Sequence, residues 1–143
     1  MQTYIVVADA SRARFFTREG EQLVEQEPLL HPEGRLHEGD LVTDRGADVH
    51  ESTATTARST HEADKAKKHE TEVFAKRVAD RLYHERVENR LGTLIMVAAP
   101  TFLGVLRDKL DDSTNRLVTH ALNKDLAESG VEEIGAAVAE LGS

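Results

Sequence analysis

The chain has 143 residues, a formal net charge of −8 and no cysteine. This length suits one domain with its own hydrophobic core, and the lack of cysteine excludes disulfides and thiolate zinc sites. The negative charge argues against a protein that coats nucleic acid indiscriminately, because such binding depends on neutralising phosphates.

The N-terminus lacks a basic region followed by a long apolar segment. No apolar run approaches the ~20 residues that cross a bilayer. We therefore expect a cytoplasmic protein without membrane contact, formed by one domain over residues 1–143.

The N-terminal end predicts three strands. An apolar run over residues 3–8 stops at a polar trio, residues 9–11, and an alternating run follows over residues 12–17. Val and Ile favour buried strands, and a period of two is typical of a half-exposed strand. Gly20 suits a tight turn, and weak alternation over residues 22–30 predicts a third antiparallel strand. Together these segments form a meander.

The hydrophobic pattern fails from about residue 34 to residue 61. This segment holds many acidic residues, three glycines and a Ser/Thr-rich stretch, with few apolar residues to bury. Ordering such a segment costs conformational entropy that little burial offsets. We predict a mobile loop over about residues 34–61.

A long helix is predicted from about residue 62 to residue 88. Thr60 could cap its N-terminus, and Gly92 lies just beyond its C-terminus, where a terminator is expected. Apolar side chains at helical spacing should form its buried stripe. They are Val73, Phe74, Val78 and Leu82.

The last third predicts alternating strands and helices. Residues 93–99 are continuously apolar, as in a central strand covered on both faces. Pro100 suits the first turn of a helix over residues 101–110. Alternation over residues 117–126 favours a strand, although a helix is compatible, and a last helix covers residues 131–141. The order βββ-loop-αβαβα predicts an α/β domain with a mixed sheet.

Asp9 and Ser11 form a polar site at the end of the first strand. Asp9 resembles the first metal-binding carboxylate of ribonuclease H-like nucleases, which need further carboxylates nearby to hold two ions. The apolar strand 93–99 ends in Ala-Ala-Pro and supplies none. We expect Asp9 to orient the turn that follows it.

Other chemistry has little support in the sequence. Nucleophile-elbow, phosphate-loop and dinucleotide motifs are absent. The seven histidines and the acidic loop lack the spacing of a metal site. We predict no catalytic residue, metal or cofactor.

Basic residues are biased toward the first hairpin, the loop and the start of the long helix. Such a basic edge can contact phosphates through point charges and backbone donors, although a mixed-charge helix exposed only for solubility is the alternative. The candidate RNA- or ribosome-binding residues are Arg12, Arg14, Arg45, Arg58, Lys65, Lys67, Lys68 and His69.

Five segments, in order along nearly the whole chain, resemble those of bacterial proteins described as required for attachment to host cells. They are IVVADASRARFF at 5–16, DRG at 44–46, HETEVFAKRVA at 69–79, LIMVAAPTFLGVLR at 94–107 and NKDL at 123–126.

That family is similar in fold to the middle domain of archaeal and eukaryotic peptide-chain release factors. The resemblance implies a ribonuclease H-like mixed sheet with flanking helices. Catalytic release factors carry a Gly-Gly-Gln loop before the long helix, and this sequence has none. The resemblance therefore implies a non-catalytic contact with ribosome or tRNA rather than peptidyl-tRNA hydrolysis.

Three functions are compatible with the sequence. The first is a non-enzymatic factor associated with ribosome or tRNA. The second is a protein-interaction module, of unspecified oligomeric state, that acts indirectly in cell attachment or stress response. The third is a divalent-metal hydrolase centred on Asp9.

Overall fold

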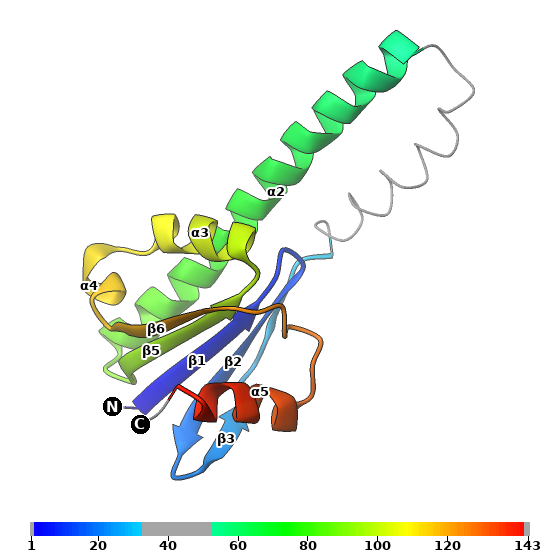
Figure 1. Cartoon of the computed structure of the whole chain (residues 1–143). Helices are drawn as coiled ribbons and strands as arrows, with labels where there is room; N and C mark the ends of the chain where they lie inside the picture. The colour runs from blue at the N-terminus through cyan, green and yellow to red at the C-terminus, as the bar shows by residue number, and fades with distance from the viewer. Residues whose placement is uncertain (1, 33–52, 142–143) are drawn as a thin grey trace.

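The computed structural model describes residues 2–32 and 53–141, with side chains from residue 64 onward in the second stretch. Its centre is a six-stranded mixed sheet with the order β3-β2-β1-β5-β6, in which β4 also pairs with β2 (Figure 1). Strand β1 runs antiparallel to β2 and parallel to β5, and β5 runs parallel to β6. The strands are β1 (Gln2–Ala8), β2 (Arg12–Glu19), β3 (Gln22–Glu25), β4 (Leu29–Leu30), β5 (Leu91–Ala98) and β6 (Val118–Asn123).

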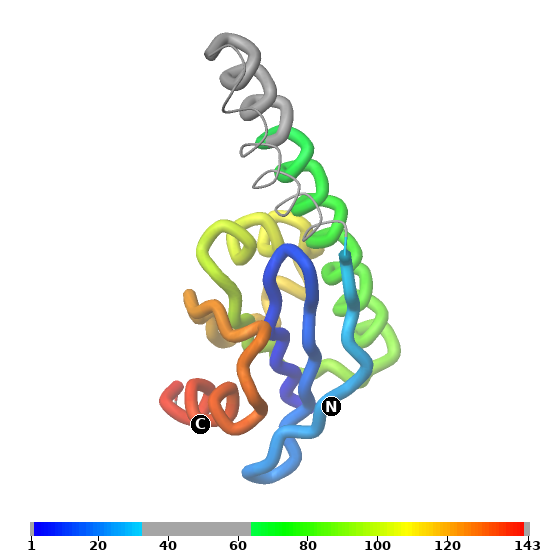
Figure 2. The backbone as a smooth tube through the Cα atoms, turned by 90° about the vertical axis from the view of Figure 1, so that its right-hand side faces the viewer, coloured from blue at the N-terminus to red at the C-terminus, as the bar shows by residue number. Residues whose placement is uncertain are grey.

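Helices cover both faces of the sheet, as Figures 1 and 2 show. One face packs against α2 and α3 through a core that includes Phe15, Phe74 and Leu106. The other face packs against α5 through Ile5 and Ile134. The helices are α2 (Thr53–Val87), α3 (Pro100–Lys109), α4 (Asp112–Asn115) and α5 (Val131–Ala139).

Strand β5 confirms the reading of its continuous apolar run. Leu94 and Met96 belong to the core under α2 and α3, whereas Ile95 and Val97 belong to the core under α5. A strand buried on both faces has no reason to alternate apolar and polar residues. The α/β class and the mixed sheet are therefore confirmed, and Pro100 opens α3 as predicted.

The predicted third strand over residues 22–30 is divided into β3 and β4. Pro28 lies between them and has no N–H to donate to the ladder. The carbonyl of Leu30 instead accepts from Arg77 Nη1 of α2 at 3.0 Å, and the carbonyl of Glu27 accepts from Arg81 Nη1 at 2.9 Å. Side chains of α2 therefore help to hold this segment against the domain.

Helix α2 begins at Thr53, not near residue 62. Its first turns fall in the segment predicted as a loop, so Thr60 is inside the helix and is not its cap. Neither Gly nor Pro occurs between Gly46 and Gly92, and a nucleated helix propagates at little cost through residues that do not break it. The rest of the predicted loop, residues 34–52, lies outside the described residues.

Two further expectations about α2 are wrong in detail. Phe74, Val78 and Leu82 are fully buried, but Val73 is 38% exposed, because a step of one residue turns the helix by about 100° away from the core. Gly92 lies inside β5, and the chain leaves the helix through Asn89, whose φ is +62°. Asn tolerates this left-handed conformation better than most residues.

The segment between the predicted helix 101–110 and the predicted strand 117–126 contains the short helix α4. Asp111 caps it, because its carboxylate accepts from the backbone N–H of Thr114. Burial alone would raise the pKa of Asp111, but hydrogen bonds from Thr114 and the nearby Arg86 outweigh it and lower this pKa. No helix within the described residues is both long and apolar enough to span a membrane.

A polar cluster of the buried Tyr4 and Glu85 with the half-exposed Arg90 joins β1, α2 and the residue before β5. The Tyr4 hydroxyl donates to Glu85 Oε2 at 2.8 Å, and Arg90 Nε donates to the same oxygen at 2.6 Å. Burial alone would raise the pKa of Glu85, but the hydrogen bonds from Arg90 and Tyr4 outweigh it and hold this pKa below its usual value. Burial and the contact with Glu85 raise the pKa of Tyr4. The cluster therefore favours an ionised carboxylate beside a neutral phenol.

Replacement of Glu85 by Ala should lower the free energy of unfolding by about 2–3 kcal/mol, because the buried Tyr4 hydroxyl loses its acceptor. Urea denaturation would measure the loss. The matched control is Asp80→Ala, which removes the exposed ion pair between Asp80 and Lys76 and should change stability by less than about 0.5 kcal/mol. Equal losses in both variants would contradict the structural role of Glu85.

The same cluster has a defined pH dependence. A depressed folded-state pKa stabilises the fold above the unfolded pKa of glutamate, about 4.3, and this contribution declines as pH falls through the lower folded-state value. Glu85→Gln should therefore flatten the loss of stability on the acid side. Thermal melts between neutral and acidic pH would test this, and identical acid limbs in the two proteins would refute it.

Candidate functional site

A cleft of about 310 Å³ lies where β1, β5 and β6 end. Residues from the β1–β2 turn, from α2, from the start of α3 and from the segment after β6 surround it. In open α/β sheets, ligands bind at the carboxyl ends of the strands. The polar side chains that line the cleft are Asp9, Ser11, Lys67, Thr71, Thr101 and Asp125.

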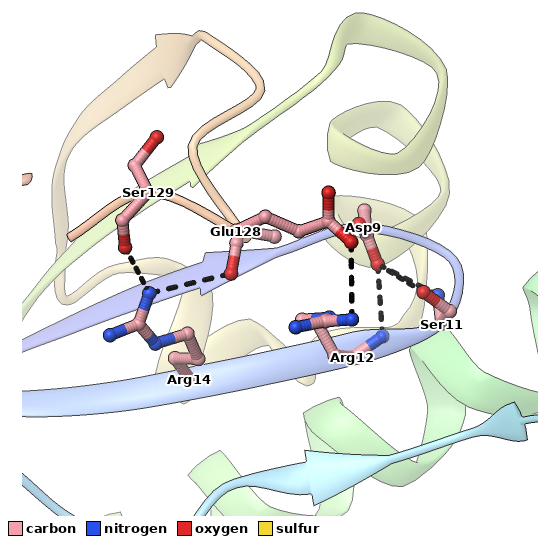
Figure 3. Close-up of polar contacts among 7 residues, drawn as sticks. Asp9, Ser11, Arg12, Arg14, Glu128 and Ser129 are labelled. Carbon is pink, nitrogen blue, oxygen red and sulfur yellow. Dashed lines mark hydrogen bonds and ion pairs between the residues drawn. The ribbon is translucent and has the colours of Figure 1, made fainter.

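Asp9 organises the turn at one wall of the cleft (Figure 3). Its Oδ1 accepts from the backbone N–H of Ser11 at 2.8 Å, from the Ser11 hydroxyl at 3.0 Å and from the backbone N–H of Arg12 at 2.9 Å. These contacts close the turn that Asp residues favour. Asp9 therefore has the turn-orienting role that the sequence predicted, and it also lines the cleft.

Helix α2 supplies the opposite wall through Lys67 and Thr71, one helical turn apart. The Thr71 hydroxyl donates to the carbonyl of Lys67 at 2.9 Å. Lys65, Lys68 and His69 are exposed, and none of the three is among the residues that line the cleft. Among the predicted basic residues on α2, Lys67 alone is a lining residue of the cleft within the described part of the chain.

Arg12 and Arg14 lie on the other face of the sheet, away from α2. Arg12 Nη2 is 3.2 Å from Glu128 Oε1. Arg14 contacts both carboxylate oxygens of Glu25 at 3.0 and 3.1 Å, and its Nη1 donates to the backbone carbonyls of Ala127 and Ser129 (Figure 3). These arginines hold the loop between β6 and α5, so the structure does not bring them together with the lysines of α2.

The side chains of two other predicted residues lie outside the part of the chain that the structure describes. Arg45 lies outside the described residues. Arg58 belongs to α2, but its side chain also lies outside the described part.

The sequence did not single out Thr71, Thr101 or Asp125. Thr101 follows β5 and Asp125 follows β6, so both meet Asp9 only because parallel strands end at the same edge of the sheet. Thr101 has a positional signal, because it is a polar residue close after the predicted strand 93–99, whereas Asp125 lies inside the predicted strand 117–126 and Thr71 inside the predicted helix 62–88.

His31 illustrates a structural use of histidine. It is 5% exposed, its Nε2 lies 2.7 Å from Glu70 Oε2, and its ring stacks on Phe74 with centroids 5.1 Å apart. It therefore joins the end of the β4 segment to α2. Among the described residues, no group of three or more His, Asp or Glu side chains is arranged to hold a metal ion.

Replacement of Asp9 by Ala should lower the free energy of unfolding by about 1–2 kcal/mol, because two backbone N–H groups lose their acceptor. Asp9→Asn should retain most of this stability, since an amide oxygen can accept the same hydrogen bonds. Urea denaturation of both variants would test the turn-orienting role. If Asn were as destabilising as Ala, the negative charge rather than the hydrogen bonds would stabilise the turn.

Comparisons with known proteins identify the family. Sixteen chains of solved structures are similar to this chain. One of them is described as "Archaeal protein" and is 12% identical in sequence, with a TM-score of 0.47. That match covers 97% of this chain and 38% of the other chain. The chain therefore spans under half the length of that protein. A search of curated proteins gave no match. Residues 4–138 match the profile of a family described as "Protein required for attachment to host cells". Since this match takes in nearly all of the sequence, the chain belongs to that family.

Proposed function

We propose that the protein is a non-enzymatic RNA-binding factor that associates with ribosome or tRNA in the cytoplasm. The observation that carries this proposal is the group of three lysines at the point where α2 leaves the sheet, next to the cleft. Helix α2 continues well beyond the strands (Figure 1).

The charge along this stretch suits phosphate contacts. Residues 64–69 hold Lys65, Lys67 and Lys68 against Asp64 as the single acid. The next acid, Glu70, is 2.7 Å from His31 and points toward the domain at that contact. Ammonium groups act as point charges on phosphates and do not read bases. The expected binding is therefore sequence-tolerant and sensitive to salt.

The fold supports the same proposal. The sequence resemblance implies a ribonuclease H-like, release-factor-type middle domain, and a three-stranded meander followed by two parallel strands agrees with the mixed sheet of such a domain. The sequence has no Gly-Gly-Gln, so we propose binding without peptidyl-tRNA hydrolysis. The family description suggests a role in attachment to host cells, and an RNA-associated factor would affect attachment indirectly, through the proteins that the cell makes.

The variant Lys65→Glu/Lys67→Glu/Lys68→Glu should lose salt-sensitive co-sedimentation with ribosomes and binding to tRNA. Three phosphate contacts correspond to a slope of about −2 in log affinity against log salt. The slope should approach zero in the variant. Fluorescence anisotropy with labelled tRNA at several salt concentrations would measure it.

The matched control is Arg107→Glu/Arg116→Glu/Lys124→Glu, which changes the net charge equally at exposed positions away from the start of α2. It should retain most of the affinity. Equal loss in both triple variants would mean that net charge, rather than the α2 surface, determines binding. Unchanged sedimentation of the lysine variant would overturn the proposal.

A second candidate function, a protein-interaction module, is favoured by strand β6. This strand is last in the sheet order of the described chain, so it pairs with β5 on one side only. Residues Val118–Asn123 contain no Asp, Glu, Lys, Arg or Pro. Natural edge strands are usually protected by charged residues or proline. An edge without this protection suits the addition of a strand from a partner.

Substitution of the exposed Ala121 by Lys should abolish any salt-tolerant protein partner recovered with the tagged protein, because a charge at the edge opposes strand addition. Pull-down at high salt followed by mass spectrometry would test this. Asp108→Lys, at an exposed position on α3, is the control and should keep the partner. If Ala121→Lys recovers the same partner, β6 is not the interface.

A further inference from the structure

A second pocket, of about 400 Å³, lies at the end of the sheet opposite to the cleft. The end of α2, the first residues of β5, α4 and the residue before β6 surround it. Figure 1 shows α4 at this end, away from the N-terminal half of α2. The charged residues of the lining are Arg86 and Arg116, and no Asp or Glu of the described residues belongs to it. This pocket is therefore cationic in a chain of net charge −8.

Arg86 is held in place by contacts within the protein. Its Nε donates to Thr114 Oγ1 at 3.1 Å, and its Nη2 lies 3.2 Å from Asp111 Oδ2. Its guanidinium also lies 5.2 Å from the centre of the Tyr83 ring. None of these hydrogen bonds uses Nη1, whose N–H groups can donate to a ligand. A side chain that is already ordered loses little conformational entropy on binding.

Arg116 lies close to Arg86 because both contact Thr114. The backbone N–H of Arg116 donates to the Thr114 carbonyl at the end of α4, and Arg86 bonds the Thr114 side chain. Within the described part of the chain, the guanidinium of Arg116 has no ion pair or hydrogen bond of its own. One pocket therefore combines a fixed guanidinium with a second one that is available to a ligand.

Two neutral donors adjoin the arginines. Asn89 follows Arg86 by three residues, and its backbone N–H donates to the Arg86 carbonyl at 2.9 Å. Ser113 precedes Arg116 by three residues, so the two lie on the same side of the α4 turn. Both Asn89 and Ser113 line the pocket. Their side-chain amide and hydroxyl add N–H and O–H groups to those of the guanidinium groups.

Negative groups near the pocket leave this character in place. Asp111 balances the charge of Arg86, so the two arginines together keep one positive charge in excess. Glu88 and Asp112 are exposed and do not belong to the lining. The last carbonyls of α2 accept from the backbone N–H groups of residues 88–90. The negative end of this helix therefore has its acceptors occupied.

We infer that this pocket binds the phosphate group of a small organic phosphate monoester. The planar guanidinium of arginine donates to two phosphate oxygens at once. A phosphate monoester has three terminal oxygens, whereas a carboxylate has two, so a phosphate matches the number of donors better. This inference is independent of RNA binding by α2, because the lysines lie beside the cleft at the other end of the sheet.

The rest of the lining suits the organic part of such a ligand. Leu91 and Leu117 add apolar atoms next to the donors. Small-molecule sites typically combine apolar walls with a few polar groups and occupy about 300–1,000 Å³. The volume of about 400 Å³ lies within this range. The pocket therefore has space for a phosphate with a ring or a short chain attached.

The test uses phenyl phosphate and inorganic phosphate as probes at neutral pH and constant ionic strength. Amide NMR spectra of the ¹⁵N-labelled protein report both the affinity and the place of binding. Saturable shifts are expected at Asn89, Gly92, Ser113 and Arg116, which line the pocket. Phenyl phosphate should bind about fivefold more tightly than inorganic phosphate, because its ring can contact the apolar atoms.

Arg116→Gln should weaken the binding of phenyl phosphate about tenfold, because a charged hydrogen-bond donor is lost. The side chain of Arg116 is exposed, so urea denaturation should show natural stability. The matched control is Arg107→Gln, which removes the same charge at an exposed position on α3 outside the lining. It should keep the natural affinity. Arg86 is less suitable for replacement because it also holds Asp111 and Thr114.

Every other outcome would overturn the inference. Shifts that do not saturate, or that spare the four amides, would show that the pocket is not the site. Equal weakening by the two Gln variants would show that net charge determines binding. Equal affinity for the two phosphates would exclude a contact with an organic group. Saturation of the same amides by a short RNA without terminal phosphates would assign the pocket to phosphodiesters. None of these results tests the lysines of α2, whose variant is measured separately.

Discussion

The parallel pairing of β1 with β5 is the constraint on which the rest of the structure depends. Residues 4–8 of β1 are buried, and their partners run in register from Tyr4 beside Leu94 to Ala8 beside Ala98. The two strands therefore end level with each other. This places the turn that begins at Asp9 beside the start of α3. The cleft follows from that register, because a shift along the strands would separate its two walls.

Parallel pairing also requires a long connection between β1 and β5. Helix α2 belongs to this connection, and its length determines how much of it extends beyond the sheet. A helix of 35 residues is about 52 Å long at 1.5 Å per residue. The eight residues of β5 extend about 26 Å at 3.3 Å per residue. The sheet can therefore cover only about half of α2, and the N-terminal half extends past the strand ends (Figure 1). The lysines lie two turns before Phe74, the first buried residue among the described side chains of α2.

The elements that were predicted correctly have strong local signals. Burial is visible in the sequence of each of these segments taken alone. It appears as continuous apolar runs in β1 and β5 and as the helical repeat of Phe74, Val78 and Leu82 in α2. The start of α2 differs from the prediction because a Ser/Thr-rich segment continues a helix when neither Gly nor Pro interrupts it. Asn89 was missed because a left-handed helix end needs no glycine when Asn is present.

The residues of the candidate site were harder to predict, because distant parts of the sequence bring them together. Asp9 and Ser11 were visible at a strand end, but Asp125 lies more than a hundred residues later and joins them only through the order of the strands. Charge counting grouped Arg12 and Arg14 with the lysines. It could not show that Glu128 and Glu25 engage them on the opposite face of the sheet.

Lys67 belongs both to the lysine group of α2 and to the lining of the cleft. Exposed ammonium groups supply affinity for any polyanion, and salt weakens them. Asp9 connects the fold with the cleft, because the carboxylate that closes the β1–β2 turn also lines the cleft. Its position is thus fixed by the fold before any ligand binds, which lowers the entropic cost of recognition.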